Sequence, residues 1–286
     1  MLASVADLMG RSFSDNRISY SDRDTMLYGL SIGFGVNPLD ERQLRYVFER
    51  PALNTVPSMA TVVARGLGLL AGAGLDMNKV LHGEQRLTIH RPLPSAAELI
   101  TEGRIEAVLD KGPGKGLLIY TSTTARIAGE DAPILSHGNT IFARGDGGIG
   151  SAGQTVPVHR IPQRPADRSV SLCTREDLAL LYRLNGDANP LHADPAVAKQ
   201  AGFPRPILHG LCTYGLACRS VIEAACDFDA TRISQFDVRF SKPVFPGETI
   251  TTDLWIDGSI ISFRCRIDAR DTLVLDNGLC VLNPSA

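Results

Sequence analysis

The second half of the chain repeats the first, and this repeat restricts the possible folds more than any other feature. Three stretches recur in the same order at offsets of 153, 152 and 151 residues. The matched stretches begin at Ser21 and Thr174, at Asn37 and Asn189, and at Arg91 and Lys242. Such constant spacing indicates two copies of one unit of roughly 140 residues.

A glycine- and proline-rich segment separates the two copies. It starts at Gly145 and continues past Pro157 to Pro165, a composition typical of linkers. Residues 145–150 also match the G-x-G-x-x-G pattern of dinucleotide-binding loops, but the residues that follow do not begin a helix. We therefore interpret the segment as a linker and expect two domains, residues 1–150 and 151–286.

Composition and charge exclude several classes of protein. Apolar residues make up 44% and charged residues 21% of the 286 residues, which is typical of a globular chain. The formal net charge of −2 argues against nucleic acid as a partner. No apolar run reaches the ~18 residues of a membrane span. The N-terminus lacks a secretory signal, and Asn283–Ala286 is neither a lipidation nor a peroxisomal signal, so we expect a cytoplasmic protein. The alternative is a peroxisomal protein whose C-terminus is truncated.

All six cysteines lie in the second half, and none forms a C-x-x-C pair. Without a secretory signal, we expect them to be buried and reduced. A zinc site needs cysteines and histidines at short spacings, whereas here they are scattered, so we expect no metal.

Each copy is expected to contain a short helix, a turn-rich loop, a longer helix of small residues and then several strands. In the second copy, Thr174 and Asp177 predict a capping box at the start of the short helix. Residues 209–225 are apolar on nearly all sides, which predicts a buried helix. The predicted strands are Phe236–Phe240, Thr249–Ile256, Ile260–Ile267 and Thr272–Leu282. This order predicts an α+β fold in which an antiparallel sheet wraps a buried helix.

The densest group of polar side chains follows the short helix of the second copy. Asp187, Asn189 and His192 lie in one loop that the Asn-Pro pair turns, so the carboxylate and the imidazole can converge. A carboxylate and an imidazole that share a water form a general acid–base pair. The alternative is a simple helix stop with a surface histidine.

Gly210 stands where the buried helix begins. The first amides of a helix have no partner within it and attract negative charge, so a ligand oxygen can bind there as in an oxyanion site. The alternative is a glycine required for close packing. We interpret the neighbouring His209 as structural.

The two copies differ at the acid–base positions. Asp187 and His192 correspond to Gly35 and Asp40 in the first copy, although the Asn-Pro-Leu turn is kept. The sequence therefore predicts one active site per chain.

The stretch Tyr182–Pro195, continued by Pro206–Thr213, resembles the hydratase 2 motif of the MaoC-like (R)-specific 2-enoyl-CoA hydratases. This family includes the hydratase part of peroxisomal multifunctional enzyme type 2. The similarity extends over most of the chain and includes His82–Gln85, Val108–Gly112 and Arg239–Pro243. Asn185 stands where the family commonly has serine.

The resemblance implies a double hot-dog fold, with two long helices each wrapped by an antiparallel sheet. It implies reversible syn hydration of trans-2-enoyl-CoA to (R)-3-hydroxyacyl-CoA by a stand-alone hydro-lyase of fatty-acyl metabolism. No cofactor is expected, since the coenzyme A thioester is itself the substrate. A homodimer is expected.

The resemblance also assigns roles to residues. Asp187 and His192 would hold and activate the water, Asn189 would orient them, and the Gly210 amide would polarise the thioester carbonyl. The implied substrate contacts are His82, Gly83, Lys111 and Phe240.

Two other functions are compatible with this fold, an acyl-CoA thioesterase and a non-catalytic acyl-CoA-binding protein. The Asp187, Asn189 and His192 set favours the hydratase over both. The sequence does not identify the acyl chain, although the small residues of Ala71–Gly74 suggest a widened acyl tunnel.

Overall fold

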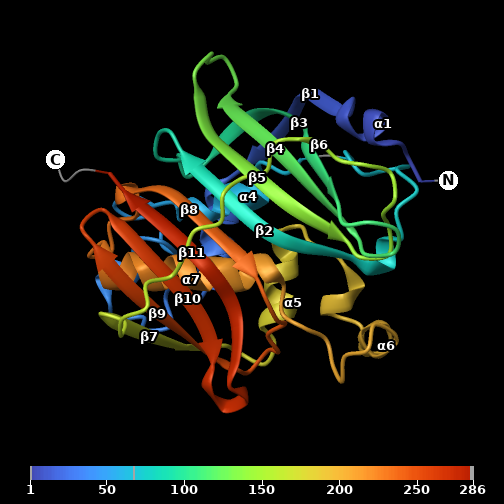
Figure 1. Ribbon diagram of the computed structural model, residues 1–286. Helices are drawn as coiled ribbons and strands as arrows, with labels where there is room; N and C mark the ends of the chain where they lie inside the picture. The colour runs from blue at the N-terminus through green and yellow to red at the C-terminus, as the bar shows by residue number, and fades with distance from the viewer. Residues whose placement is uncertain (1, 67, 284–286) are drawn as a thin grey trace.

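The computed structural model describes residues 2–66 and 68–283 (Figure 1). Most of the C-terminal stretch Asn283–Ala286 lies outside these ranges. The strands of the first copy are β1 (Ser12–Tyr20), β2 (Val80–Ile89), β3 (Ala97–Asp110), β4 (Leu117–Ile127) and β5 (Pro133–Ala143). Those of the second copy are β7 (Arg168–Cys173), β8 (Ile233–Phe240), β9 (Thr249–Asp257), β10 (Ile260–Ile267) and β11 (Thr272–Leu282). The predicted strands of the second copy are thus confirmed, with β8 and β9 slightly longer than expected.

All these strands form one antiparallel sheet in the order β1-β3-β4-β5-β2-β8-β11-β10-β9-β7. The second half of this order is the first half reversed, so the copies have the same topology. They join where β2 pairs with β8, with Gln85 opposite Val238. The division into domains 1–150 and 151–286 stays a prediction, since the sheet is continuous across it.

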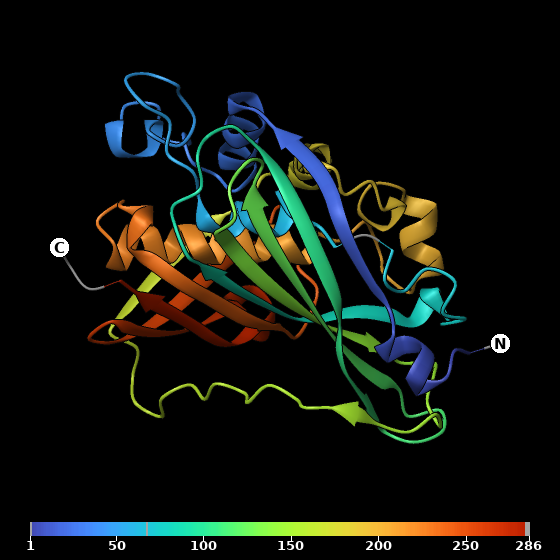
Figure 2. The same ribbon diagram turned by 90° about the horizontal axis from the view of Figure 1, so that it is seen from above.

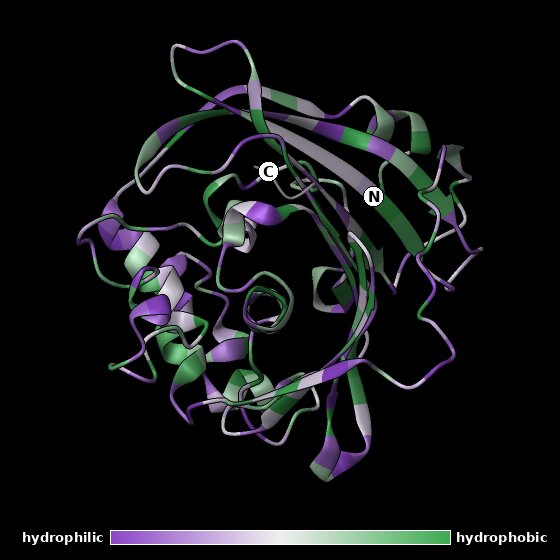
Figure 3. Cartoon of the chain, turned by 90° about the vertical axis from the view of Figure 1, so that its left-hand side faces the viewer, coloured by the Kyte–Doolittle hydropathy of each residue, from purple (hydrophilic) through white to green (hydrophobic). Residues whose placement is uncertain are grey.

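The helices of the first copy are α1 (Val5–Met9), α2 (Asp22–Ser31), α3 (Glu41–Leu44), η1 (Pro57–Met59), α4 (Ala60–Val63) and η2 (Met77–Lys79). Those of the second are α5 (Leu178–Tyr182), η3 (Arg183–Asn185), η4 (Pro190–His192), α6 (Pro195–Gln200), α7 (Gly210–Ala225), η5 (Ala230–Arg232) and η6 (Asp268–Arg270). Figure 3 views α7 nearly along its axis, with the sheet curved around it. The predicted buried helix is confirmed, because α7 residues 212–222 are all buried. No helix of the described residues has the length and hydropathy of a membrane span.

The prediction of a long helix in the first copy was wrong. Only η1 and α4 form there, and Ala64 leaves the helical conformation. Glycines at positions 66, 68, 72 and 74 follow, and glycine is among the weakest helix formers. The helix is therefore one turn long where its counterpart α7 has 16 residues.

The capping box predicted at Thr174 and Asp177 was also wrong. The Thr174 hydroxyl instead donates to the Glu248 carbonyl 2.7 Å away, and Asp177 pairs with Arg175. Tertiary contacts thus supply the partners that a local cap would have used.

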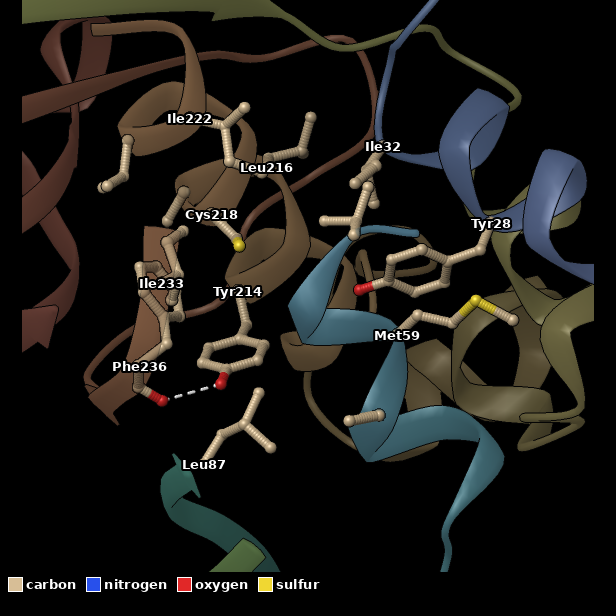
Figure 4. Close-up of a cluster of buried hydrophobic side chains, with 14 of the residues drawn as sticks. Tyr28, Ile32, Met59, Leu87, Tyr214, Leu216, Cys218, Ile222, Ile233 and Phe236 are labelled. Atoms are coloured by element: carbon tan, nitrogen blue, oxygen red, sulfur yellow. Dashed lines mark hydrogen bonds between the residues drawn. The ribbon is translucent and has the colours of Figure 1, made fainter. Parts of the chain in front are cut away.

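Both copies contribute to one hydrophobic core (Figure 4). Tyr28 and Leu87 of the first copy pack in the same cluster as Tyr214 and Phe236 of the second. The Tyr214 hydroxyl donates to the Phe236 carbonyl at 2.7 Å, so this buried phenol is satisfied. Because apolar surface is buried between the copies, each copy fixes the position of the other.

The linker crosses the molecule as an extended segment (Figure 2). Its short strand β6 (Ala152–Gly153) pairs with β3. The amides of Gly148 and Gly150 donate to the Asp110 carboxylate, and these bonds lower the pKa of Asp110 to about 2. The amides of the G-x-G-x-x-G stretch therefore bind a carboxylate of the chain itself, and residues 154–167 form no helix, as the linker interpretation predicts.

The cysteines are free, and five of the six are buried. Cys173, at the end of β7, is exposed, contrary to expectation.

Candidate active site

The loop after α5 and η3 sets the position of Asp187. Gly186 ends η3 in the left-handed conformation with φ of +98°, which glycine adopts without strain. The backbone N–H of Asn189 donates to the Asp187 carboxylate at 3.2 Å. The side-chain oxygen of Asn189 caps η4 by accepting from the backbone N–H of Leu191. Asn189 thus shapes the turn that separates Asp187 from His192.

Asp187 and His192 converge, as the sequence predicts, and His209 lies beside them. One carboxylate oxygen of Asp187 and one ring nitrogen of each histidine all lie within 4.8 Å of one another. His192 and His209 are buried, whereas Asp187 is partly exposed. Of the described residues, this trio is the group with the spacing to hold a metal ion.

Hydrogen bonding fixes the tautomer of His192. Its Nδ1 lies 2.9 Å from the Ile207 carbonyl oxygen. A carbonyl only accepts, so Nδ1 carries the hydrogen and Nε2 keeps its lone pair. Burial lowers the pKa of His192 below 6.5, against the Ile207 bond and the Asp187 charge, which raise it. The imidazole is therefore neutral at neutral pH and can accept a proton at Nε2.

His209 contacts both His192 and Asp187. Its ring stacks on that of His192 with centroids 3.8 Å apart, and its Nε2 lies 3.3 Å from the Asp187 carbonyl oxygen. Burial, followed by the nearby His192, lowers the pKa of His209 to about 4. The ring is thus a neutral donor to the backbone of Asp187, which agrees with a structural role.

The start of α7 faces the same site. Gly210 is exposed, and no described residue supplies an acceptor for its amide. The Phe240 ring packs close to Gly210, where a Cβ would lie 3.2 Å from it. The site therefore places a free helix amide next to an aromatic wall.

A β-bulge brings His82 to this wall. The pairing of β2 with β5 passes from His82 opposite Ile141 to Glu84 opposite Thr140, which leaves Gly83 unpaired. Because side chains alternate along a strand, the extra residue turns His82 to the inner face. Its ring lies 4.7 Å from that of Phe240, and burial lowers the pKa of His82 to about 4. Close packing explains the glycine at position 83, since a Cβ there would approach the Thr140 carbonyl oxygen to 3.0 Å.

Of these residues, Asp187 and His82 line a pocket of about 320 Å³. It includes Asp187, Tyr182 and Leu211 of the second copy together with side chains of the first. The first-copy residues are Thr61, Val62, Arg65, Gly66, His82, Gln85, His137, Asn139 and Ile141. Gly66, Asn139 and Ile141 also line a second pocket of about 640 Å³, which contains residues 71–74. The two pockets therefore adjoin, and the larger one lies where the first copy lacks a long helix.

Two first-copy residues that sequence reasoning missed hold the loop that carries Asp187. Arg65 donates to the carbonyls of Asn185, at 2.6 Å, and of Gly186. The Asn185 amide nitrogen donates to the Ser31 hydroxyl at 3.0 Å. The repeat itself contained a signal for the first of these, since Arg219 follows Arg65 at an offset of 154 residues.

His137 of β5 was also missed. Its Nε2 lies 2.7 Å from the Ala64 carbonyl, so Nδ1 keeps a lone pair, and no described residue donates to it. A buried acceptor thus remains available in the pocket.

Lys111 is placed apart from these residues. Its Nζ lies 4.9 Å from the ring centroid of Phe142, next to Ile141 in β5. Neighbouring side chains of a strand point to opposite faces, so Lys111 lies on the face opposite the pocket. Its predicted contact with substrate stays a prediction.

Known proteins are similar to this chain in sequence and in fold. A model of the MaoC-like domain matches residues 157–277, and a model of the MFE-2 hydratase 2 N-terminal domain matches residues 18–145. The peroxisomal enoyl-CoA hydratase 2 of Arabidopsis thaliana is 35% identical over 94% of this chain and 92% of its own length. The crystal structure of a MaoC-like dehydratase from Phytophthora capsici is 30% identical, with a TM-score of 0.88 over 98% of both chains. A Mycobacterium tuberculosis protein described as a double hot dog, 18% identical with a TM-score of 0.61 over 98% of both chains, shares the fold.

Proposed function

Because this chain belongs to the MaoC-like enoyl-CoA hydratase 2 family and is a double hot-dog hydro-lyase, we propose that it hydrates trans-2-enoyl-CoA to (R)-3-hydroxyacyl-CoA. Hydration of enoyl-CoA in fatty-acid metabolism is the activity that its relatives support. The finer proposal concerns the residues that act and the face of the double bond that they use.

The observation that carries the proposal is the convergence of Asp187 and His192 beside a pocket of about 320 Å³ that Asp187 lines. The carboxylate and the lone pair on His192 Nε2 are both acceptors, so a water between them can donate to each. As its oxygen bonds to C3 of the enoyl group, the pair removes one proton and returns one to C2. Both transfers occur from the side where the pair lies, which gives syn addition and leaves the net protonation unchanged.

The Gly210 amide supplies the complementary electrostatics. Addition at C3 moves negative charge to the thioester oxygen, and a helix-start amide without a partner can donate to it. In this pose His82 and Phe240 flank the thioester, and Asn189 keeps the Asp187 turn in shape.

The acyl chain is proposed to occupy the adjoining pocket of about 640 Å³. Its residues are mainly small or apolar, and Gly72 has no neighbour within 4 Å of a Cβ. The glycines that end α4 early therefore provide space for a long or bulky chain.

The test is a reaction of the full chain with trans-2-decenoyl-CoA, followed by loss of enoyl-thioester absorbance and by chiral analysis of the product. We expect the (R)-alcohol from the wild type and almost none from Asp187→Asn. Asp177→Asn, which changes an exposed aspartate of the same half, is the matched control and should retain full activity. Release of free CoA without hydration would instead assign a thioesterase, and binding without turnover a non-catalytic acyl-CoA protein.

The homodimer and the cytoplasmic location stay proposals. Sedimentation analysis of the purified chain checks the first. A tagged chain in cells checks the second, and it should be scored against peroxisomes because the Arabidopsis relative is named as peroxisomal.

A further inference from the structure

Arg65 has a counterpart that lacks the same partners. Arg219 lies on α7, 154 residues after Arg65, and each guanidinium lies against a left-handed glycine of the other copy. These glycines are Gly186 for Arg65 and Gly33, with φ of +87°, for Arg219. Arg65 donates to carbonyls of its loop, whereas no described residue accepts a hydrogen bond from Arg219.

Arg219 is nevertheless buried, with 6% of its surface exposed. None of the described carboxylates forms an ion pair with it. Burial lowers the pKa of Arg219, and Glu223 on the same helix contributes only a longer-range electrostatic attraction that raises it. Its guanidinium lies over the Phe34 ring, whose centroid is 5.4 Å from Cζ. A buried cation without a hydrogen-bonded anion is unfavourable, so this guanidinium is suited to bind one.

The guanidinium lines a pocket of about 510 Å³ that is separate from the active site. Most of its other residues are apolar, namely Leu30, Phe34, Val36, Leu178, Leu180, Leu181 and Leu216. Arg175 and Asp177 also line it but pair with each other, and the Thr174 hydroxyl is bonded to Glu248. Arg219 is therefore the polar group of this pocket that has no partner.

We propose that this pocket binds an amphiphilic carboxylate of the fatty-acid type, with its carboxylate on Arg219 and its chain along the leucines. A carboxylate accepts two parallel hydrogen bonds from a guanidinium. In an acyl-CoA the thioester end of the chain is uncharged, so the free acid fits the pocket better. Leu30, Val36 and Leu180 are exposed at its rim, and a bound chain would cover them.

The proposal does not depend on the catalytic assignment, because binding is measured without turnover. Calorimetric titration of the full chain with decanoate should show binding, and uncharged 1-decanol should bind at least about tenfold more weakly. Arg219→Gln should weaken decanoate binding by about tenfold or more. Arg175→Gln, which changes the paired arginine of the same pocket, should change it by less than about twofold.

Two further variants keep the test decisive. Val36→Trp fills the exposed rim and should abolish binding even if Arg219→Gln fails to fold. Ala71→Trp narrows the pocket near the active site and should leave Arg219-dependent binding intact. The proposal is overturned if the wild type does not bind decanoate, or if Val36→Trp binds it normally. Loss of binding in Ala71→Trp would also overturn it by placing the ligand in the acyl pocket.

Discussion

The two copies of the repeat keep the same strand order but differ in the helix that the sheet wraps. In the second copy α7 has 16 residues and begins directly after His209, which contacts Asp187, whereas α4 in the first copy has four residues. The pocket of about 640 Å³ lies beside the shortened helix. The second copy thus has the long helix whose start lies at the candidate site. The first copy has a pocket beside a much shorter helix.

The loops of the two copies show the same division. The second copy carries Asp187 and His192, and the first has Gly35 and Asp40 at those positions. Yet the first copy supplies Arg65, Ser31 and His82 to the active site, which is therefore composite. The copy without the Asp and His of this loop therefore helps to fix the geometry of the copy that has them.

The largest difference is expected between Asp187 and the matched loop of the first copy. Asp187→Asn should lower kcat/KM by about 10²- to 10⁴-fold, because an amide cannot take a proton from water. Asp40→Asn, at the position equivalent to His192, should leave kcat/KM unchanged, since Asp40 caps α3 and pairs with Arg42 outside the active site. Initial rates with trans-2-decenoyl-CoA check both, and a comparable loss in Asp40→Asn would contradict the assignment of one active site.

The next largest difference is expected between Arg65 and its counterpart Arg219, in their effects on kcat. Arg65→Met removes the bonds that hold Asn185 and Gly186, so we expect kcat to fall by about 10- to 100-fold with a smaller change in KM. Arg219→Met should leave kcat within about twofold. Arg65→Lys should restore part of the rate, and equal effects of the two methionine variants on kcat would reduce Arg65 to a general packing role.

The pH dependence of the rate tests His192. The proposed mechanism uses its neutral form, and burial lowers its pKa below 6.5, so kcat/KM should stay level near neutrality and fall about tenfold per unit at pH below that pKa. A rate profile of the wild type from pH 4.5 to 8 would show this limb. If His192→Gln shows the same limb in its residual rate, another group is responsible.

Stability should depend on pH through one histidine of each copy. His82 and His209 have folded pKa values of about 4, below the unfolded value near 6.5, so the unfolded chain binds more protons between these pH values. Their stabilisation is complete above pH 6.5 and lost as pH falls toward 4, and between pH 7 and pH 5 the loss is roughly 2 kcal/mol for each residue. Urea unfolding at pH 7 and pH 5 measures it, and His82→Gln and His209→Gln should each remove part of the difference.

The smallest contrast concerns the two short helices. Asp24 accepts from the Ser21 amide at 2.8 Å and hydroxyl at 2.7 Å, so Asp24→Ala should cost about 1 kcal/mol. The equivalent Asp177 only pairs with exposed Arg175, so Asp177→Ala should cost less than about 0.5 kcal/mol. The free energies of unfolding in urea check this order. The reverse order would contradict the assignment of a helix cap to Asp24 and of none to Asp177.

Much of the second copy followed from its sequence. The apolar run of α7 and the β-branched stretches of β9 to β11 predicted these elements, because burial imposes a local pattern. The Asn-Pro turn likewise predicted that Asp187 and His192 meet. Failures came where distant groups compete with local ones, as at Thr174, whose hydroxyl bonds Glu248 instead of capping α5.

By itself the sequence determined the repeat, the strand pattern and the loop that carries the acid and the base, since each is encoded in residues close together along the chain. The family resemblance also named His82, but only the tertiary structure showed how it enters the site and that Arg65, Ser31 and His137 join it. The bulge at Gly83 turns His82 inward, and Arg65 reaches Gly186 across 121 positions of sequence. Such contacts depend on strand register and on packing between the copies, which no local pattern specifies.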